Sequence, residues 1–240
     1  ADAVKFQTYV TEKRVKSDSP IYDILKQCEL SFNDQHDLFD FARDLDLIAF
    51  STPFDEESID FLMSISCPIF KIASFDSVNN SLLRRIGATG MPIILSTGMT
   101  NIEELKIAKK SLGYHENGTG CDLALLHCVS VYPTPISEAN LSMVNLLNSI
   151  HAGPVGYSDH TIGFEAPVMA VAAGATIIEK HFTLDTTAKG PDHALSADSI
   201  TFKKMVNKIR EMEQILGPKI MRLRSIEIDK DMVQYRREST

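Results

Sequence analysis

The sequence predicts an α/β protein with a parallel sheet, a (β/α)₈ TIM barrel that lacks its first strand and helix. Short β-like runs alternate with helical segments along the 240 residues, which is typical of parallel βαβ units. Polar residues follow the apolar run at almost every strand end, and in such a barrel those ends share the face that carries the active site. Seven strands can be counted, and the chain opens directly on the first of them. We therefore expect a barrel truncated at its N-terminus.

The predicted strands are short apolar runs rich in β-branched residues. They comprise residues 3–9, 47–51, 69–74, 92–96, 123–129, 154–157 and 175–180. Helical periodicity marks the segments between them, for example residues 34–45, 56–64, 102–112, 141–150 and 165–173. Asn33 and Thr100 are plausible N-terminal caps of two of these helices.

The length and composition fit one domain with a full hydrophobic core, since 44% of the residues are hydrophobic and 23% are charged. We assign residues 1–217 to the barrel. The charged segment 218–240 follows Gly217 and Pro218, and we interpret it as a linker toward an absent C-terminal domain. With a strand missing, the barrel would keep two unpaired edges, which favour association.

The net charge of −8 argues against nucleic acid or an anionic membrane as the main partner. No run of eighteen apolar residues occurs, and the chain does not begin with a basic region followed by an apolar stretch. We therefore expect a soluble, cytoplasmic protein. The four cysteines have no metal-binding or redox spacing, so reduced thiols are expected.

The segment from Gly156 to Asp192 is the most informative part of the chain. His160 and His181 end two short apolar runs about twenty residues apart, with Ser158 and Asp159 close by. Neutral imidazoles and oxygen ligands converging from neighbouring strand ends could hold a divalent cation that keeps open positions for substrate. Such a site would suit a lyase or a synthase.

Short motifs at the strand ends follow one another in a characteristic order along residues 3–192. They are Lys5-Phe6-Gln7, Phe50-Ser51-Thr52-Pro53-Phe54, Lys71-Ile72-Ala73-Ser74-Phe75, Ile94-Leu95-Ser96-Thr97-Gly98-Met99, Leu126-His127-Cys128, Tyr132-Pro133-Thr134-Pro135, Gly156-Tyr157-Ser158-Asp159-His160-Thr161, Glu179-Lys180-His181-Phe182 and Gly190-Pro191-Asp192. In this order the chain resembles the N-acetylneuraminate (sialic acid) synthase family. That family includes the legionaminate and pseudaminate synthases and spore-coat polysaccharide homologues.

The resemblance implies a metal-dependent condensation of phosphoenolpyruvate with an open-chain N-acetylated amino sugar. The sugar would be N-acetylmannosamine or a 6-deoxy-diacetamido analogue, and the products a nine-carbon 2-keto acid and phosphate. The implied cation, Mn²⁺, Mg²⁺ or Co²⁺, polarises the sugar aldehyde while C3 of phosphoenolpyruvate attacks. The resemblance also implies a homodimer in which a C-terminal antifreeze-like (SAF) domain caps the partner's site.

The same resemblance assigns the site residues. His160 and His181 match the metal ligands. The positions that hold phosphoenolpyruvate are matched by Lys5, Thr52, Lys71, Ser74, Ser96 and Ser158. The sugar-side positions are matched by Gln7, Asp76, Ser130, Tyr132 and Asp192. Catalytic roles are expected for Lys5, Lys71 and Asp76. Asp76 stands where family members often carry Glu, and Ser130 where some carry Asn, so the sugar preference stays open.

Two alternatives come from other classes of function. A barrel aldolase would use Lys5 or Lys71 as a Schiff-base lysine and would need no metal. A degenerate, non-catalytic homologue would bind neither metal nor phosphoenolpyruvate. His36, His115, His127 and His151 are expected to be structural or on the surface, and His193, beside Asp192, is expected only to line the rim.

Overall fold

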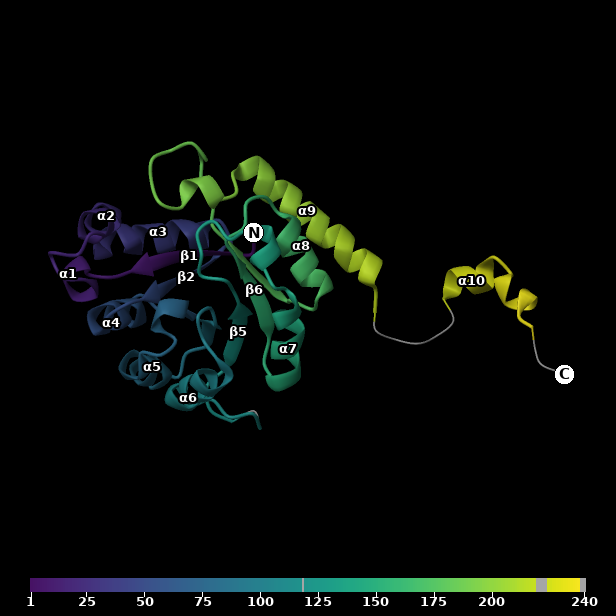
Figure 1. The fold of residues 1–240 in the computed structure, drawn as a ribbon, viewed down its shortest axis with the longest axis horizontal. Coiled ribbons are helices and arrows are strands. Elements are labelled where there is room, and N and C mark those ends of the chain that lie inside the picture. The colour runs from purple at the N-terminus through teal and green to yellow at the C-terminus, as the bar shows by residue number, and fades with distance from the viewer. Residues whose placement is uncertain (118, 219–223, 238–240) are drawn as a thin grey trace.

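Seven parallel strands form one sheet with the order β1-β2-β3-β4-β5-β6-β7 in the computed structural model, which describes residues 1–117, 119–218 and 224–237 (Figure 1). The strands are β1 (Ala3–Thr8), β2 (Ile48–Pro53), β3 (Phe70–Ile72), β4 (Ile93–Ser96), β5 (Leu123–His127), β6 (Val155–Asp159) and β7 (Ile177–Lys180). Each strand pairs in parallel with the next. The predicted sheet of seven parallel strands in chain order is confirmed.

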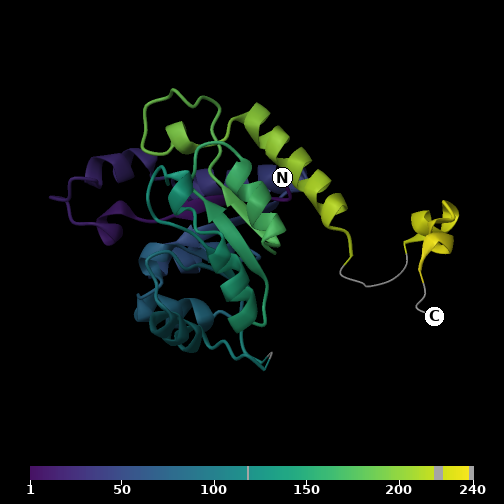
Figure 2. The ribbon, with the colours of Figure 1, turned by 45° about the vertical axis from the view of Figure 1, so that its right-hand side comes forward.

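Helices connect consecutive strands, as parallel pairing requires. They are α1 (Thr11–Arg14), α2 (Tyr22–Cys28), α3 (Phe32–Asp44), α4 (Glu56–Ser64), α5 (Asn80–Gly87), α6 (Ile102–Leu112), α7 (Ser142–Ile150), α8 (Glu165–Ala172) and α9 (Ser199–Leu216). Both views show α9 lying beside α8 (Figures 1 and 2). Arg210 on α9 also reaches Asp2, at 3.8 Å, just before β1.

Both predicted helix caps were wrong by one or two residues. Ser31 caps α3, because its hydroxyl accepts the Asp34 N–H, and Asn33 lies inside the helix. Asn101 caps α6 through a reciprocal capping box with Glu104. Thr100 is engaged elsewhere, since its hydroxyl lies 2.7 Å from the Ser77 hydroxyl.

Several strands end earlier than the apolar pattern predicted. β3 stops at Ile72, because Ser74–Asp76 turns into a 3₁₀ helix, and β5 stops at His127 rather than at residue 129. In these two strands pairing ends before Ser74 and Cys128, which follow them. In β2, β4 and β6 the polar residues Thr52, Ser96 and Ser158 are still paired.

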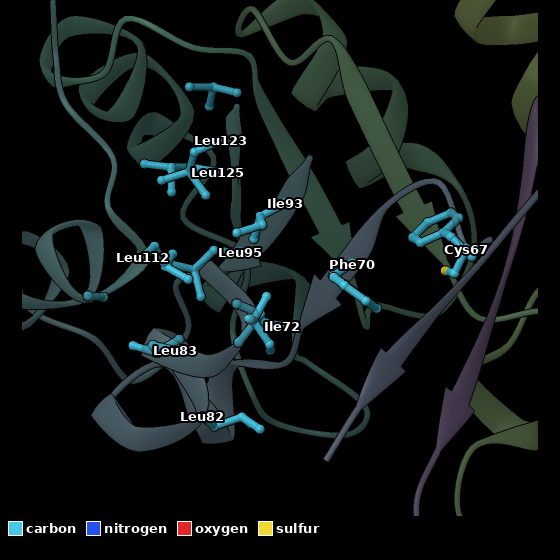
Figure 3. Close-up of a cluster of buried hydrophobic side chains, with 14 of the residues drawn as sticks. Cys67, Phe70, Ile72, Leu82, Leu83, Ile93, Leu95, Leu112, Leu123 and Leu125 are labelled. Carbon is cyan, nitrogen blue, oxygen red and sulfur yellow. The ribbon is translucent and has the colours of Figure 1, made fainter. Parts of the chain in front are cut away.

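The core lies between the sheet and the helices that cover it. Figure 3 shows part of the buried cluster, in which side chains of β3, β4 and β5 meet those of α5 and α6. Its labelled members are Cys67, Phe70, Ile72, Leu82, Leu83, Ile93, Leu95, Leu112, Leu123 and Leu125. Burial of these apolar side chains fixes the strands from behind the face that carries the polar residues.

The sheet is curled, and its two edge strands approach each other. Lys5 Nζ on β1 lies 3.7 Å from Glu179 Oε1 on β7. Within the described residues β1 pairs only with β2 and β7 only with β6. The α/β class with a curled parallel sheet is confirmed, whereas closure into an eight-stranded barrel and truncation of the first strand stay predictions.

The segment predicted to be a linker, 218–240, is described in part. Residues 219–223 and 238–240 lie outside the described residues. Between them are the short helix α10 (Ser225–Asp229) and a 3₁₀ turn at Met232–Tyr235. Among the helices of the described segments, none combines the length and apolar character that crossing a bilayer demands.

Candidate active site

A cavity of about 240 Å³ opens at the carboxyl ends of the strands. The predicted site residues that line it are Lys5, Gln7, Thr52, Lys71, Ser74, Ser96, Tyr132, Ser158, His160, His181 and Asp192. Arg14, Leu25, Phe54, Ala73, Phe75, Cys128 and Glu179 line it as well. A larger hollow of about 460 Å³ lies between α5 and α6, away from the strand ends. The curled sheet thus brings eleven of the thirteen predicted residues into one pocket.

Lys71 on β3 is held at the bottom of this cavity. Its side chain is 3% exposed, and Nζ donates hydrogen bonds to Ser96 Oγ at 2.6 Å and to the Ile72 carbonyl at 3.2 Å. Burial lowers the pKa of Lys71, while the nearby Glu179 carboxylate opposes that shift. The ammonium is therefore fixed in direction and has little access to bulk water.

Glu179 on β7 is a central residue that the sequence did not assign. Its carboxylate lies 3.7 Å from both Lys5 Nζ and Lys71 Nζ, and it accepts a hydrogen bond of 3.1 Å from Ser158 Oγ. Burial by itself would raise its pKa, but Lys5, Lys71 and His181 outweigh that effect and hold the pKa at about 2. Glu179 is therefore ionised and offsets part of the charge of the two lysines.

Hydroxyl and thiol groups cluster beside Lys71. Ser74 Oγ lies 2.9 Å from Cys128 Sγ and accepts the Gly98 N–H at 3.0 Å. A Cβ at Gly98 would lie 2.4 Å from Ser130 Oγ and 2.9 Å from Ser74 Oγ, so the close approach of these side chains requires glycine. Within the described part of the chain, Thr52 Oγ1 and Ser130 Oγ are buried without a hydrogen-bond partner. Thr52 lines the cavity, so a ligand with acceptor oxygens would satisfy its hydroxyl.

The two histidine rings lie next to each other in the cavity wall. Their ring centroids are 5.4 Å apart, and the Tyr132 ring lies 4.2 Å from His160 and 6.1 Å from His181. His160 Nδ1 lies 2.9 Å from the Val129 carbonyl, so Nδ1 must donate and Nε2 keeps its lone pair. Burial lowers the pKa of both rings, and that of His181 is about 4. Both imidazoles are therefore neutral near pH 7, as metal ligation requires.

Asp192 adds an oxygen beside this pair, with Oδ2 3.5 Å from His181 Nδ1. Across the described segments, no three His, Cys, Asp or Glu side chains are grouped so that they could hold a metal ion by themselves. The donor set fits a cation bound by two imidazoles that takes its remaining ligands from water and substrate.

Two predicted residues do not line the cavity. Asp76 sits in the 3₁₀ turn after β3, where its carboxylate accepts a hydrogen bond of 3.1 Å from Asn79. Burial raises its pKa, while Asn79 and then Arg14 act in the opposite direction. Ser130 lies behind the cavity wall, against Gly98. Their predicted roles toward a sugar stay predictions.

Arg14 is a second pocket residue that the sequence did not single out. Its guanidinium carbon lies 3.7 Å from the centroid of the Phe54 ring and 4.7 Å from that of Tyr9. Nothing in the local sequence marks this arginine, because the two rings come from β2 and the end of β1.

The fold and the pocket define a class: an α/β protein with a cationic, hydroxyl-lined site beside two neutral imidazoles at the strand ends. The model of the NeuB family matches residues 1–221, and the chain belongs to this family. The family resemblance inferred from the motifs is confirmed.

Relatives with curated names are similar over most of this chain. An uncharacterized protein of Methanocaldococcus jannaschii is 49% identical over 217 residues, covering 90% of this chain and 64% of that protein. The N,N'-diacetyllegionaminic acid synthase of Legionella pneumophila is 40% identical over 232 residues, covering 90% and 65%. The chain thus spans just under two thirds of the length of these two relatives.

A solved structure of the same family is also similar in fold. The crystal structure of N-acetylneuraminic acid (sialic acid) synthetase from Leptospira borgpetersenii matches with a TM-score of 0.91 and 34% identity. The match covers 98% of this chain and 81% of that one. The fold described above is therefore similar to that of this synthetase.

Proposed function

We propose that the protein condenses phosphoenolpyruvate with an N-acetylated amino sugar to give a nine-carbon 2-keto acid and phosphate. The observation that supports this most directly is that one cavity combines groups suited to an anion with groups suited to a divalent cation. Lys5, Lys71 and the neighbouring hydroxyls suit a phosphate and a carboxylate. His160 and His181 stand beside them as neutral nitrogen donors. The names of the relatives support the same class of reaction.

The residues of this chain would divide the work between binding and orientation. Lys71, held by Ser96, and Lys5 would donate charge-assisted hydrogen bonds to phosphoenolpyruvate. Glu179 would keep both ammonium groups in place, since it lies 3.7 Å from each. A divalent cation bound to His160 and His181 would supply Lewis-acid polarisation of the sugar aldehyde.

The sugar would occupy the outer part of the cavity. Tyr132, whose ring centroid lies 4.2 Å from that of His160, and Asp192, beside His181, would border the aldehyde end. Gln7 on β1 also lines the cavity. Candidate acceptors are N-acetylmannosamine and 6-deoxy-diacetamido sugars. The named relatives make different sugar acids, so they support this class of acceptor and not one member of it.

A Schiff-base aldolase is the competing chemistry, because burial lowers the pKa of Lys71 and thus favours an amine nucleophile. However, Lys71 Nζ is already bonded to Ser96 and faces Glu179, which favours the ammonium form. Borohydride trapping with a 2-keto acid tests this alternative directly. A stable adduct on Lys71 would support the aldolase.

The proposed function is tested by phosphate release from phosphoenolpyruvate. The assay uses N-acetylmannosamine or a 6-deoxy-diacetamido sugar, each with Mn²⁺ or with EDTA. We expect release that requires both a sugar and the metal. Release with no sugar dependence, or no release with any sugar, would contradict the proposal.

A further inference from the structure

The guanidinium of Arg14 is rigidly placed in the wall of the cavity. Arg14 ends α1, beyond the end of β1, and its Cζ lies 3.7 Å from the Phe54 ring centroid. Tyr9 packs edge-on against Phe54, with ring centroids 6.0 Å apart, and its hydroxyl donates to the Leu25 carbonyl at 2.9 Å. The two aromatic rings are thus fixed by their own contacts, and they fix the plane of the guanidinium.

This guanidinium has no carboxylate within 4 Å among the residues that the structure describes. Its one hydrogen bond in that part of the chain is a long one, 3.4 Å, to Gln7 Oε1. Arg43, Arg85 and Arg210, by contrast, each pair with a carboxylate. A guanidinium carries five N–H donors, so most of those of Arg14 are available to a ligand.

Burial lowers the pKa of Arg14, which means that its charge is partly removed from water. The side chain is half-buried, so a ligand that displaces water from it must supply an acceptor for its donors. The position of Arg14 in the cavity wall, with Gln7 and Leu25 beside it, makes a substrate oxygen the natural acceptor.

The residues around Arg14 favour a neutral hydrogen-bond acceptor over an anion as its ligand. Lys5 and Lys71, with several hydroxyls, supply the part of the lining that suits an anion. Arg14 is one cation that packs on Phe54, shares the cavity lining with the apolar side chains of Leu25 and Phe75, and feels the field of the Asp76 carboxylate. Asp76 would weaken the binding of an anion, whereas apolar surfaces beside a strong donor suit an amide, which carries a carbonyl oxygen and a methyl group.

We propose that Arg14 is a specificity-determining residue that binds an acetamido group of the acceptor sugar at the end remote from its aldehyde. The amide oxygen accepts from the guanidinium, and the methyl group packs against Phe54 and Leu25. The inference rests on the proposed function and narrows it, because it favours acceptors with a second acetamido group over those with a hydroxyl in its place.

The test compares two 6-deoxy sugars that differ at a single carbon. One is 2,4-diacetamido-2,4,6-trideoxymannose, and the other is 2-acetamido-2,6-dideoxymannose, which has a hydroxyl at C4. The wild-type protein should prefer the diacetamido sugar by roughly ten- to a hundredfold in kcat/KM, the range that one hydrogen bond to a charged group supplies. Arg14→Met, which keeps apolar contact with the rings, should lose most of this preference.

Lys13→Met is the matched control, because Lys13 is the preceding residue and its exposed side chain pairs with Glu57. It should retain the full preference. Phosphoenolpyruvate binding, measured by calorimetry, and the melting temperature should be unchanged in Arg14→Met, which separates a specificity effect from unfolding.

The outcomes of this test distinguish failure of the Arg14 assignment from failure of the proposed function. Sugar-dependent phosphate release with equal preference in wild type and Arg14→Met would overturn the role of Arg14 and leave the synthase intact. A wild type that favours the hydroxyl sugar would also overturn it. No release with either sugar, or with N-acetylmannosamine, would contradict the proposed function, and the assignment of Arg14 would fail with it.

Discussion

Asp159 Oδ2 and Lys180 Nζ form an ion pair of 2.7 Å in which the side chains are 0% and 1% exposed. The two residues are register partners on β6 and β7, and each immediately precedes one of the paired histidines, His160 and His181. The Tyr157 hydroxyl and the Thr161 N–H also donate to Asp159 Oδ1, at 3.0 Å each. This ion pair therefore fixes the position of one imidazole relative to the other.

Replacing Lys180 by Met should destabilise the protein by about 3–5 kcal/mol, because Asp159 would remain buried without its counter-charge. Urea unfolding followed by circular dichroism measures this. The double variant Asp159→Asn/Lys180→Met should recover part of the loss, since it removes both charges. Equal stability of Lys180→Met and wild type would show that the pair contributes nothing.

The histidine pair should bind a divalent cation without any substrate. We expect calorimetry of the EDTA-treated, dialysed protein to show one Mn²⁺ site. His160→Ala and His181→Ala should each weaken it by at least about tenfold, since loss of a residue that only supports a metal ligand already costs about 10- to 100-fold. His36→Ala, on the exposed face of α3, serves as the control. Unchanged Mn²⁺ affinity in both pocket variants would place the metal elsewhere.

Glu179 should control the pH range over which Lys71 binds phosphoenolpyruvate. Burial lowers the pKa of Lys71 and the Glu179 carboxylate raises it, so Glu179→Gln should lower the pKa further. Because the ammonium form binds the anion, affinity should fall as the pH rises through that pKa. The decline should therefore begin at lower pH in the variant.

Calorimetric titrations of phosphoenolpyruvate between pH 7 and about 10 would follow this shift across the ordinary range of a lysine. Glu103→Gln, on the exposed surface of α6, is a control for loss of one negative charge from the whole protein. An identical alkaline limb in wild type and Glu179→Gln would mean that the carboxylate does not act on Lys71.

His151 should make the protein less stable in mild acid. It is buried, Nε2 lies 3.0 Å from the Leu123 carbonyl, and Nδ1 is buried without a partner in the described structure. Burial lowers its pKa, the Leu123 hydrogen bond opposes this, and Lys109 and Glu116 act with smaller effects of opposite sign. The unfolded chain therefore binds the proton more readily than the fold does.

The stability that neutral His151 contributes is present above about pH 6.5 and is lost as the pH falls below that value. The contribution of His151 to the fall in unfolding free energy should approach about 1 kcal/mol per pH unit. His151→Gln, measured by urea unfolding between pH 7 and pH 5, should flatten the decline, while the exposed His115→Gln should not. His127, His160 and His181 act in the same direction, since burial lowers the pKa of each of them too, so much of the decline should remain.

The predicted order of parallel strands was correct because it depends on local patterns. Each strand is an apolar run of a few residues followed by polar ones. In each helix the apolar residues recur with the helical period, so strands and helices can both be recognised along the chain. The caps show where this reasoning loses precision. Asn101 caps its helix while the hydroxyl of neighbouring Thr100 is already bonded to Ser77 across the fold, which the local pattern does not show. Ser31 caps the other helix two residues before Asn33.

The roles of Glu179 and Arg14 could not be predicted from the sequence. Glu179 stood in a quoted motif, yet its role depends on Lys5 and Lys71, which lie on two strands far away in the sequence. The sequence around Arg14 does not distinguish it from other helical arginines. Only the fold brings its guanidinium to 3.7 Å from the Phe54 ring centroid.

The sequence by itself determined the class of fold, the family and most of the pocket, because those follow from periodicity and from residues at strand ends. Only the tertiary structure decided which charges neutralise one another and which remain open to a ligand. Curling of the sheet brings Lys5 within 3.7 Å of Glu179 across the two edge strands. Burial raises the pKa of Glu179, but Lys5, Lys71 and His181 outweigh it and lower that pKa. Distance and desolvation are properties of the folded chain, and no spacing along the sequence encodes them.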